Sequence, residues 1–279
     1  MDTKFINLRF ENNKKVIEVG RGKPYRLLNI EGIEAGEIEL STADNILYDG
    51  SKVRNRRIKF RPITIECEYT GDDKEAQRRF LAGFFNVHYD GILKIDYAGV
   101  KRETLYIVEG FRAKLENVYN PLGFLVHLYC PDPFWLDNFE ISKEITVWIG
   151  GISFPLRLPT TFAMAGPRII NIVNNGDVKT PVKIEIYGPA TNPKITLRET
   201  GEFIRIKDTL TADDVVVITT EFGNKRVEKN GQNAFNILDL PDSTFFSLQV
   251  GDNVIEFTTE DVSNNANVKI SYRNRYLGV

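Results

Sequence analysis

The second half of the chain is divided into short apolar runs by turn-forming residues, and this pattern restricts its fold more than any other feature. Ten runs of strand length follow residue 140, with groups of Asn, Gly, Asp and Pro between them. Residues of these types favour tight turns, and short strands at this spacing are typical of a β-sandwich or jelly roll. We therefore expect an all-β second half with the strands ITVWI, ISFPLRL, RIINIV, PVKIEIYG, PKITLRE, EFIRI, VVVITT, STFFSLQV, NVIEFTT and VKISYR.

The first half contains strands that alternate in polarity. Ile63, Ile65 and Cys67 share one face of the segment 58–70, while Glu66 lies on the other, as in a half-buried strand. Pro62 has no N–H to donate, so the start of this strand is expected at a sheet edge or a bulge. Further strands are predicted at 92–96, 103–111 and 123–130.

One helix is predicted in the first half, over residues from about 73 to 87. Asp72 can cap it, and Glu75 stands at the spacing of a capping box. An apolar stripe follows at helical spacing, which is typical of a helix face that covers a sheet; its residues are Ala76, Phe80, Phe84 and Val87. Strands around one helix predict a β-sandwich or α+β first domain.

A proline-rich segment separates the two halves. Because prolines hold themselves and the preceding residue in extended shapes, this segment predicts a stiff interdomain connector; it consists of Pro131, Asp132, Pro133, Phe134 and Trp135. A chain of 279 residues is also longer than one core usually supports. The sequence thus predicts a first domain over 1–130, a connector with the first strand over 131–150, and a second domain over 151–279.

The composition narrows the classes of function. A formal net charge of −2 gives no overall field for binding nucleic acid or acidic membranes. No apolar run reaches the roughly 18 residues of a membrane span, and MDTKFINLRFENNKK lacks the apolar stretch of a signal peptide, so we expect no membrane insertion and no export by that route. Cys67 and Cys130 are expected to be free buried thiols.

Catalytic and metal-binding patterns are not found in the sequence. His88 and His127 are the two histidines, and neither has a second ligand at metal-binding spacing. No GxSxG, P-loop or HExxH motif occurs. The acid pairs Asp213/Asp214 and Asp239/Asp242 are interpreted as turn residues. We therefore predict no catalytic residue, no metal site, no cofactor and no enzymatic activity.

Several motifs together resemble one family. The segment YCPDPFWLD resembles the connector of siphophage distal tail proteins, the baseplate hub proteins of long-tailed bacteriophages. The segment YDGSKVRNRRIKFRPITIECEY is similar to that family's turn, at Asp49 and Gly50, and its following strand. Residues of the second half fit the family in order: Asn174, Asn175, Gly176, Gly188, Asn192, Pro193, Asn230, Gly231, Ser243, Phe245, Phe246, Gly251, Asn253, Tyr276 and Gly278.

The resemblance implies a structural protein of a phage or prophage tail. It implies a homo-oligomer, a hexameric ring built by the first domain around a DNA channel, with transient DNA passage, and a galectin-like second domain at the rim. The implied partners are the tail tube, the tail-tip protein and, in many phages, a receptor-binding protein. The protein would lie at the tail tip or baseplate of the virion, after assembly in the bacterial cytoplasm.

A polar segment from about Ser41 to Arg57 is the candidate arm for such an oligomer, since it is long for a hairpin turn. Its basic run either lines the channel or contacts a neighbouring subunit, or it is a solvated turn and outer strand face. The candidate interface and channel residues are Asp49, Gly50, Lys52, Arg54, Arg56 and Arg57, and the run continues to Lys59 and Arg61.

A carbohydrate-binding module for the bacterial surface is the alternative function, with a glycan-processing enzyme as a third. Sugar sites typically stack a sugar on an aromatic ring and bind its hydroxyls with polar side chains. The signature residues of galectins cannot be assigned to positions here. The aromatic candidates, for which packing is the competing interpretation, are Tyr187, Phe203, Phe222 and Tyr272, beside Trp148 near the first strand.

Overall fold

The computed structural model describes residues 5–13, 15–34, 36–44, 49–114, 120–146, 168–260 and 266–279. They divide into two compact units, Met1–Asn138 with Arg275–Val279, and Phe139–Asn274. The three-part division predicted from the sequence does not include this return of the chain to the first unit at Arg275. Its boundaries stay a prediction. Trp148, the strand ISFPLRL and most of ITVWI lie outside the described residues.

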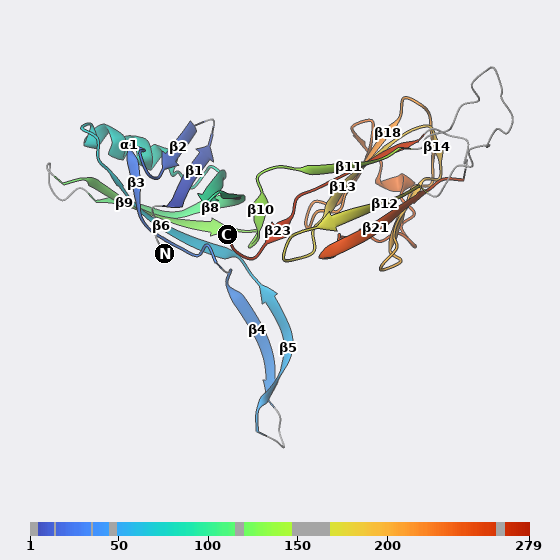
Figure 1. Cartoon of the computed structure of the whole chain (residues 1–279), viewed down its shortest axis with the longest axis horizontal. Helices are drawn as coiled ribbons and strands as arrows, with labels where there is room; N and C mark the ends of the chain where they lie inside the picture. Colours follow the sequence, from blue (N-terminus) through green and yellow to red (C-terminus); the bar gives the residue numbers. More distant parts are fainter. Residues whose placement is uncertain are drawn as a thin grey trace. The chain divides into compact units, whose positions relative to one another are not determined.

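The first unit is built on a nine-stranded sheet in the order β23-β10-β8-β7-β1-β2-β3-β6-β9, with β4 and β5 as a separate pair (Figure 1). The strands are β1 (Ile6–Asn12), β2 (Lys15–Val19), β3 (Tyr25–Glu31), β4 (Ile38–Asp44), β5 (Ser51–Ile58), β6 (Arg61–Tyr69), β7 (Gly91–Tyr97), β8 (Val100–Lys114), β9 (Leu122–Cys130), β10 (Trp135–Asp137) and β23 (Arg275–Tyr276).

Strand β8 folds this sheet back on itself. Its first part, up to Tyr106, pairs with β7, and its second part, from Ile107, pairs with β9. The register shifts between Val108 and Gly110, as expected where an irregularity bends a strand. The two halves of the sheet enclose one core, which includes Phe10, Ile65, Leu93, Tyr106 and Val126.

The alternation predicted for β6 is confirmed. Ile63, Ile65 and Cys67 are buried and Glu66 is exposed. Pro62 does not lie on an edge strand as expected, because β6 lies between β3 and β9. The pairing with β3 ends at Thr64, however, so β3 has no partner residue opposite Pro62 and needs no N–H from it.

The helix α1 (Lys74–Phe84) is three residues shorter at its C-terminal end than the sequence predicts. Its N-cap is Asp73, which makes no side-chain capping bond, and Glu75 pairs with Arg78 instead of closing a capping box. Leu81 and Phe84 are its buried residues. The predicted stripe is therefore partly wrong: Phe84 packs into the core, whereas Ala76 and Val87 are exposed.

The strands β4 and β5 form a ribbon that extends away from the rest of the first unit (Figure 1). At its base the Glu37 amide donates to the Phe60 carbonyl and the Lys59 amide to the Glu37 carbonyl, both at 2.9 Å. The Phe60 ring stacks on Tyr129 of β9, with 4.6 Å between the ring centroids. The ribbon is thus anchored at its base and exposed along its length.

Arg61, at the start of β6, is fully buried and joins three parts of the first unit. Its guanidinium donates to the carbonyls of Gly32 and Pro133, both at 2.8 Å, and to the carbonyl of Leu277. It also lies over the ring of Trp135, 5.5 Å from the ring centroid. One side chain therefore holds the turn after β3, the segment after β9 and the C-terminal residues together.

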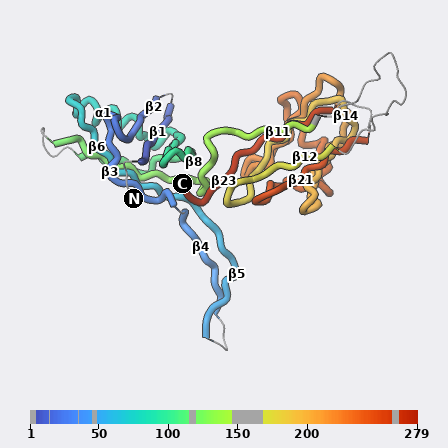
Figure 2. Tube along the Cα trace, in the orientation of Figure 1, coloured from blue at the N-terminus to red at the C-terminus, as the bar shows by residue number. Residues whose placement is uncertain are grey.

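The return of the chain at β23 is part of this arrangement. β23 pairs with β10, with Trp135 opposite Tyr276 and Leu136 opposite Arg275, and Figure 2 shows β23 entering the first unit. Arg275 also pairs with Asp132 and lies over the ring of Phe134 at 4.6 Å. The segment predicted as a connector therefore packs into the first unit through Phe134 and Trp135.

The second unit is entirely β apart from one short 3-10 helix among its described residues. A sheet in the order β11-β22-β13-β18-β19-β20 and a sheet in the order β12-β21-β15-β16 share one core, and β14 pairs with β17. The elements are β11 (Ile141–Thr146), β12 (Arg168–Asn174), β13 (Val182–Tyr187), β14 (Ala190–Thr191), β15 (Lys194–Leu197), β16 (Phe203–Arg205), β17 (Thr209–Leu210), β18 (Val215–Thr219), β19 (Arg226–Lys229), β20 (Gln232–Asn233), η2 (Phe235–Ile237), β21 (Gly251–Thr258) and β22 (Asn267–Tyr272).

The predicted fold class is confirmed as mainly β: among the described residues, the first half has one α-helix and the second half is β apart from the short η2. The strand expected at STFFSLQV is wrong: this segment is irregular apart from a bridge between Leu248 and Thr180. Phe246 and Leu248 are nevertheless buried in the core. The apolar residues of this segment pack into the core, although the segment does not pair along its length with a neighbouring strand.

Replacement of Arg61 by Met tests the role of the buried guanidinium. The variant leaves three buried carbonyl acceptors without their donor, each costing about 1–3 kcal/mol. We expect a loss of about 3 kcal/mol in the free energy of unfolding, or a fall in Tm on the order of 10 °C, measured by calorimetry. The matched change Arg54→Met, at an exposed arginine, should leave Tm within a degree or two; equal effects would contradict the assigned role of Arg61.

The prediction of two free, buried cysteines is confirmed, and it has a chemical consequence. Burial raises the pKa of the Cys130 thiol to about 12 and raises that of Cys67 as well. Since the thiolate is the reactive form, neither should react with a maleimide at pH 7.5 in the folded chain, and both should react in denaturant. Rapid labelling of the native chain, followed by mass spectrometry, would contradict this burial.

Candidate functional site

The β4–β5 ribbon has two different faces, which its register defines. One face carries the cross-strand pairs Ile38–Ile58, Leu40–Arg56 and Thr42–Val53, and the other carries Glu39–Arg57, Ser41–Asn55 and Ala43–Lys52. We call the first the apolar face and the second the polar face. Arg54 is left without a partner where the register shifts, and this bulge places Val53 on the apolar face.

The apolar face is exposed to solvent. Ile38 is 63% exposed, Leu40 58% and Val53 47%. An isolated two-stranded ribbon is marginally stable in water unless a further layer packs on it. Apolar side chains gathered on such a ribbon are typical of a surface that binds another protein.

The polar face contains the ion pairs of the ribbon. Glu39 accepts hydrogen bonds from Arg57, which lies opposite it, and pairs with Lys59 at 3.3 Å. The hydrogen bond from Arg57, and then that from Lys59, hold the pKa of the Glu39 carboxyl below its usual value. Two of the six cations of the basic run thus share one carboxylate, which compensates one positive charge.

The six sequence-predicted interface residues all lie on this ribbon, but they do not form one basic strip. Asp49 and Gly50 lie at its distal end, and Gly50 has a φ of 102°, which favours glycine. Lys52 and Arg57 belong to the polar face, whereas Arg56 belongs to the apolar face. The expected continuation of the run to Arg61 is wrong, because Arg61 is buried in the first unit.

Sequence reasoning missed the apolar face itself. Its signal was the alternation of Ile38 and Leu40 with Glu37, Glu39 and Ser41, which matches a half-buried strand. The bulge at Arg54 could not be read from the sequence, and without it Val53 would lie on the polar face.

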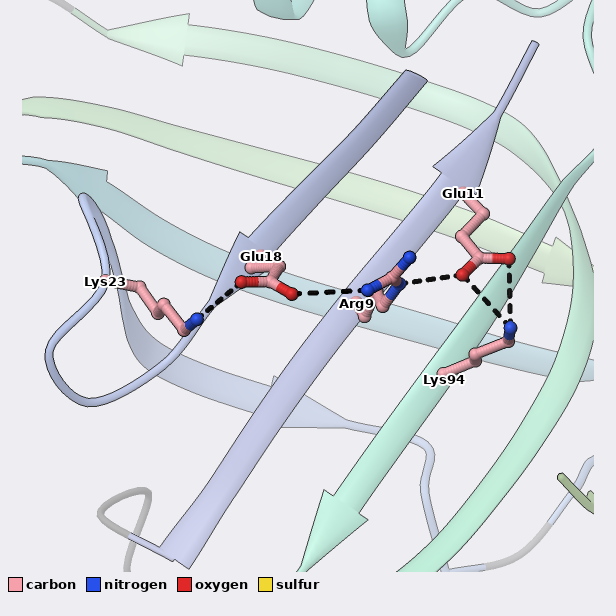
Figure 3. A network of polar contacts seen from close by, with 5 residues as sticks. All are labelled: Arg9, Glu11, Glu18, Lys23 and Lys94. Atoms are coloured by element: carbon pink, nitrogen blue, oxygen red, sulfur yellow. Dashed lines mark hydrogen bonds and ion pairs between the residues drawn. The ribbon is translucent and has the colours of Figure 1, made fainter. Parts of the chain in front are cut away.

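A second surface of the first unit carries a network of ion pairs (Figure 3), and a groove lies beside it. Arg9 pairs with Glu11 at 2.7 Å and with Glu18 at 3.4 Å, while Lys94 binds Glu11 at 3.0 Å and Lys23 binds Glu18. The hydrogen bond from Lys94 is the largest cause that lowers the pKa of Glu11, and the hydrogen bond from Lys23 is the largest that lowers the pKa of Glu18. Three cations thus share two carboxylates on the outer face of β1, β2 and β7, which leaves one net positive charge.

The groove lies beside this network and has a volume of about 530 Å³. Its lining includes the apolar Val16, Ile92 and Leu105 and charged residues of both signs: Asp90, Glu11, Arg9 and Lys15. The register of the sheet puts Val16, Glu11, Ile92 and Leu105 in one row across β2, β1, β7 and β8. Val16 and Leu105 are 44% and 56% exposed, so the row exposes apolar side chains on both sides of the charged Glu11.

The aromatic candidates of the second unit are mostly engaged in packing. Tyr272 is buried, and Phe203 is covered by Lys194, whose ammonium lies 3.9 Å from the ring centroid. Tyr187 is half-buried and donates to Glu185. Phe222 differs, since it is 81% exposed.

The polar candidates have structural partners. Asp239 is buried and pairs with Arg205 and Lys207, and the Thr211 amide and hydroxyl donate to Asp214. His127 shares a hydrogen bond with Thr64 at 3.1 Å. In the described part of the chain, no group of three or more His, Cys, Asp or Glu side chains is placed to bind a metal ion, and no helix is long and apolar enough to cross a membrane.

Residues 175–276 match the family model described as "Siphovirus-type tail component, C-terminal domain". This part of the chain is thus similar to the C-terminal domain of siphovirus-type tail components. The resemblance to siphophage distal tail proteins that the sequence indicates is thus confirmed. No match is found among the curated protein sequences.

The fold of this chain is similar to that of solved phage proteins over nearly its whole length. The crystal structure of SPP1 Dit, described as a paradigm of the hub adsorption apparatus in phages that infect Gram-positive bacteria, has a TM-score of 0.70 and 13% identity, covering 97% of this chain and 99% of that chain. A chain of the phage P2 baseplate in its activated conformation with Ca has a TM-score of 0.53 and 14% identity, with 95% and 97% covered. At such identities the likeness establishes a shared fold.

Proposed function

We propose that this chain is the distal tail protein of a phage or prophage, and that it forms a hexameric hub ring. The ring would join the tail tube to the tail tip or baseplate and surround the DNA channel. The observation that carries the proposal is the likeness to the SPP1 hub protein across both units, with 97% of one chain and 99% of the other covered. The match of residues 175–276 to a tail-component family supports it independently.

The first unit is proposed to build the ring and the second, as a galectin-like sandwich, to occupy the rim. A cyclic ring needs a head-to-tail contact in which two different surfaces of each subunit meet. The β4–β5 ribbon is suited to such a contact, since seven residues of strand extend over roughly 23 Å. Its exposed apolar face supports an interface with another protein chain.

The role is proposed to be structural, with no reaction, no cofactor and no membrane insertion. The partners would be the tail tube, the tail-tip protein and a receptor-binding protein, at the tip of a virion assembled in the bacterial cytoplasm. DNA would pass through transiently. The net charge of −2 supports passage over tight binding, because strong phosphate binding requires a large positive field.

The carbohydrate-binding alternative has less support. Of the four aromatic residues considered for a sugar platform, Tyr272 is buried and Phe203 is covered by Lys194. Phe222 is exposed, but it stands in a turn with Glu221 and Asn224, which bond to each other. A sugar site built on this turn would use one aromatic ring.

The ring is tested by light scattering behind size exclusion over a range of concentrations, with negative-stain imaging, for the chain alone and with its tail-tip protein. We expect a species of about six times the chain mass of 31.8 kDa, seen as a ring with an open centre. A single-copy mass under all these conditions would contradict the proposal. If such a monomer also bound a bacterial glycan array, the carbohydrate-binding function would replace it.

Charge reversal on the ribbon tests its part in assembly. The double variant Arg54→Glu/Arg56→Glu should lower the fraction of ring, or phage infectivity where the gene can be exchanged, while Tm changes by less than a degree or two because both residues are exposed. The control Arg21→Glu/Lys179→Glu changes net charge equally at exposed sites away from the ribbon. Full assembly and infectivity in the double variant would show that these arginines are solvated surface.

A further inference from the structure

The last residues of the chain, Arg275–Val279, are attached to the outside of the first unit, and we call them the C-terminal peptide. The buried apolar core of that unit is built from residues between Ile6 and Trp135. From the C-terminal peptide, Tyr276 and Val279 pack against this core and are partly buried. The sheet is closed by the pairing of β8 with β9, while β23 lies at its edge beside β10. The peptide is thus added to a closed sheet.

Two side chains of the C-terminal peptide meet groups of matching chemistry on the first unit. Arg275 pairs with the carboxylate of Asp132 and lies over the ring of Phe134, 4.6 Å from the ring centroid. The guanidinium of Arg102 lies over the ring of Tyr276, 3.5 Å from its centroid. A cation and an aromatic ring of the peptide are therefore each recognised by a specific partner.

The next two residues of the peptide are held through the backbone. Arg61 donates a hydrogen bond to the carbonyl of Leu277, whose side chain is exposed. Gly278 lies close to Glu34: a Cβ at position 278 would be 2.8 Å from the Glu34 carbonyl oxygen, closer than real side chains approach. The site therefore requires glycine at position 278 and accepts other side chains at position 277.

We propose that the first unit contains a peptide-binding site whose ligand is the C-terminal peptide of the same chain, and that this peptide docks and is released as one piece. β23 pairs with β10 at two positions, so few backbone hydrogen bonds oppose its release. Release opens one donor of Arg61 to water, which lowers stability but leaves the closed sheet in place. The proposal does not depend on the ring.

Docking changes how the second unit is attached to the chain. The chain leaves the first unit after Asn138 and returns to it at Arg275. With the C-terminal peptide docked, the second unit is tied to the first at both of its ends. With the peptide released, it is tied at one end only. The peptide thus acts as a latch that sets the number of attachments.

Trimming of the full chain by a carboxypeptidase that prefers apolar C-terminal residues measures release. The enzyme should remove Val279 from the released peptide, so its rate, followed by mass spectrometry, reports the released population. Arg275→Glu, which sets two like charges together at Asp132, should be trimmed roughly tenfold faster than the wild type or more. The control Leu277→Ala, at an exposed side chain, should stay within about twofold of the wild-type rate.

A charge exchange separates release from general unfolding. In the double variant Asp132→Arg/Arg275→Glu opposite charges face each other again, so it should be trimmed more slowly than Arg275→Glu alone. Circular dichroism melting should show a cooperative transition for all these variants. Equal trimming of the single and the double variant would show that this ion pair does not hold the peptide.

Binding of the free peptide Arg-Tyr-Leu-Gly-Val, labelled with fluorescein at its N-terminus, gives a second readout by anisotropy. It should bind the full-length Arg275→Glu chain roughly tenfold more tightly than the wild-type chain, whose own C-terminal peptide competes for the site. The same peptide carrying Gly278→Ala should bind roughly tenfold more weakly, because its Cβ meets the Glu34 carbonyl. A peptide carrying Leu277→Ala should bind as the native sequence does.

Two results would overturn the proposal. A wild-type chain trimmed as fast as Arg275→Glu would show that the docked state does not persist. Equal binding of the native and the Gly278→Ala peptides to the Arg275→Glu chain would show that the first unit has no separable site for this sequence. Neither readout requires assembly, so failure of the ring and failure of the latch are distinguished.

Discussion

The double pairing of β8 is the constraint on which the rest of the first unit depends. One strand of fifteen residues closes the core by pairing with β7 over its first part and with β9 over its second. The register shifts between Val108 and Gly110, shortly after the point at which the pairing passes from β7 to β9. The segment with the buried Trp135 follows β9 directly. The pairing of β8 with β9 therefore also fixes where the chain leaves the first unit.

The segment after β9 depends on a second constraint, the burial of Arg61. A guanidinium taken out of water must have its donors satisfied, and here three carbonyls from distant parts of the sequence accept them. One of these belongs to Leu277, so the C-terminal residues are part of the structure that the first unit needs. Gly32 belongs to it too: its φ is 87°, and a Cβ there would lie 1.9 Å from the Pro62 carbonyl oxygen.

Local sequence patterns predicted what depends on local pairing. The alternation of Ile63, Ile65 and Cys67 identified β6, and the recurring turn signals identified a second half whose described residues contain no α-helix. The local patterns failed where contacts between distant parts of the chain decide the position of a residue. Arg61 looks like one more cation in a basic run, and only the carbonyls brought to it by the fold make it a core residue. Phe246 and Leu248 alternate as in a strand, yet no neighbouring strand pairs along them.

The candidate site was predicted in position but not in chemistry, for the same reason. The length and polarity of the segment 41–57 indicated an arm, and its density of cations directed attention to charge. The bulge at Arg54 depends on how two strands pair, and it is this irregularity that gathers Val53 with Leu40 on one face. The alternation of residues in the sequence does not show where a bulge moves the following residues to the other face of the ribbon.

The basic run was expected either to line the channel or to contact a neighbouring subunit. The two faces of the ribbon separate these two roles. Arg56 shares a face with Leu40, so in the proposed ring it would be covered by the neighbouring copy and withdrawn from any passing phosphate. Lys52 and Arg57 lie on the other face, where Glu39 already binds Arg57. On the strands of the ribbon, that face carries one net positive charge, from Lys52 and Arg57 against Glu39. Such a surface would hold DNA weakly, and weak holding is what movement through a channel requires.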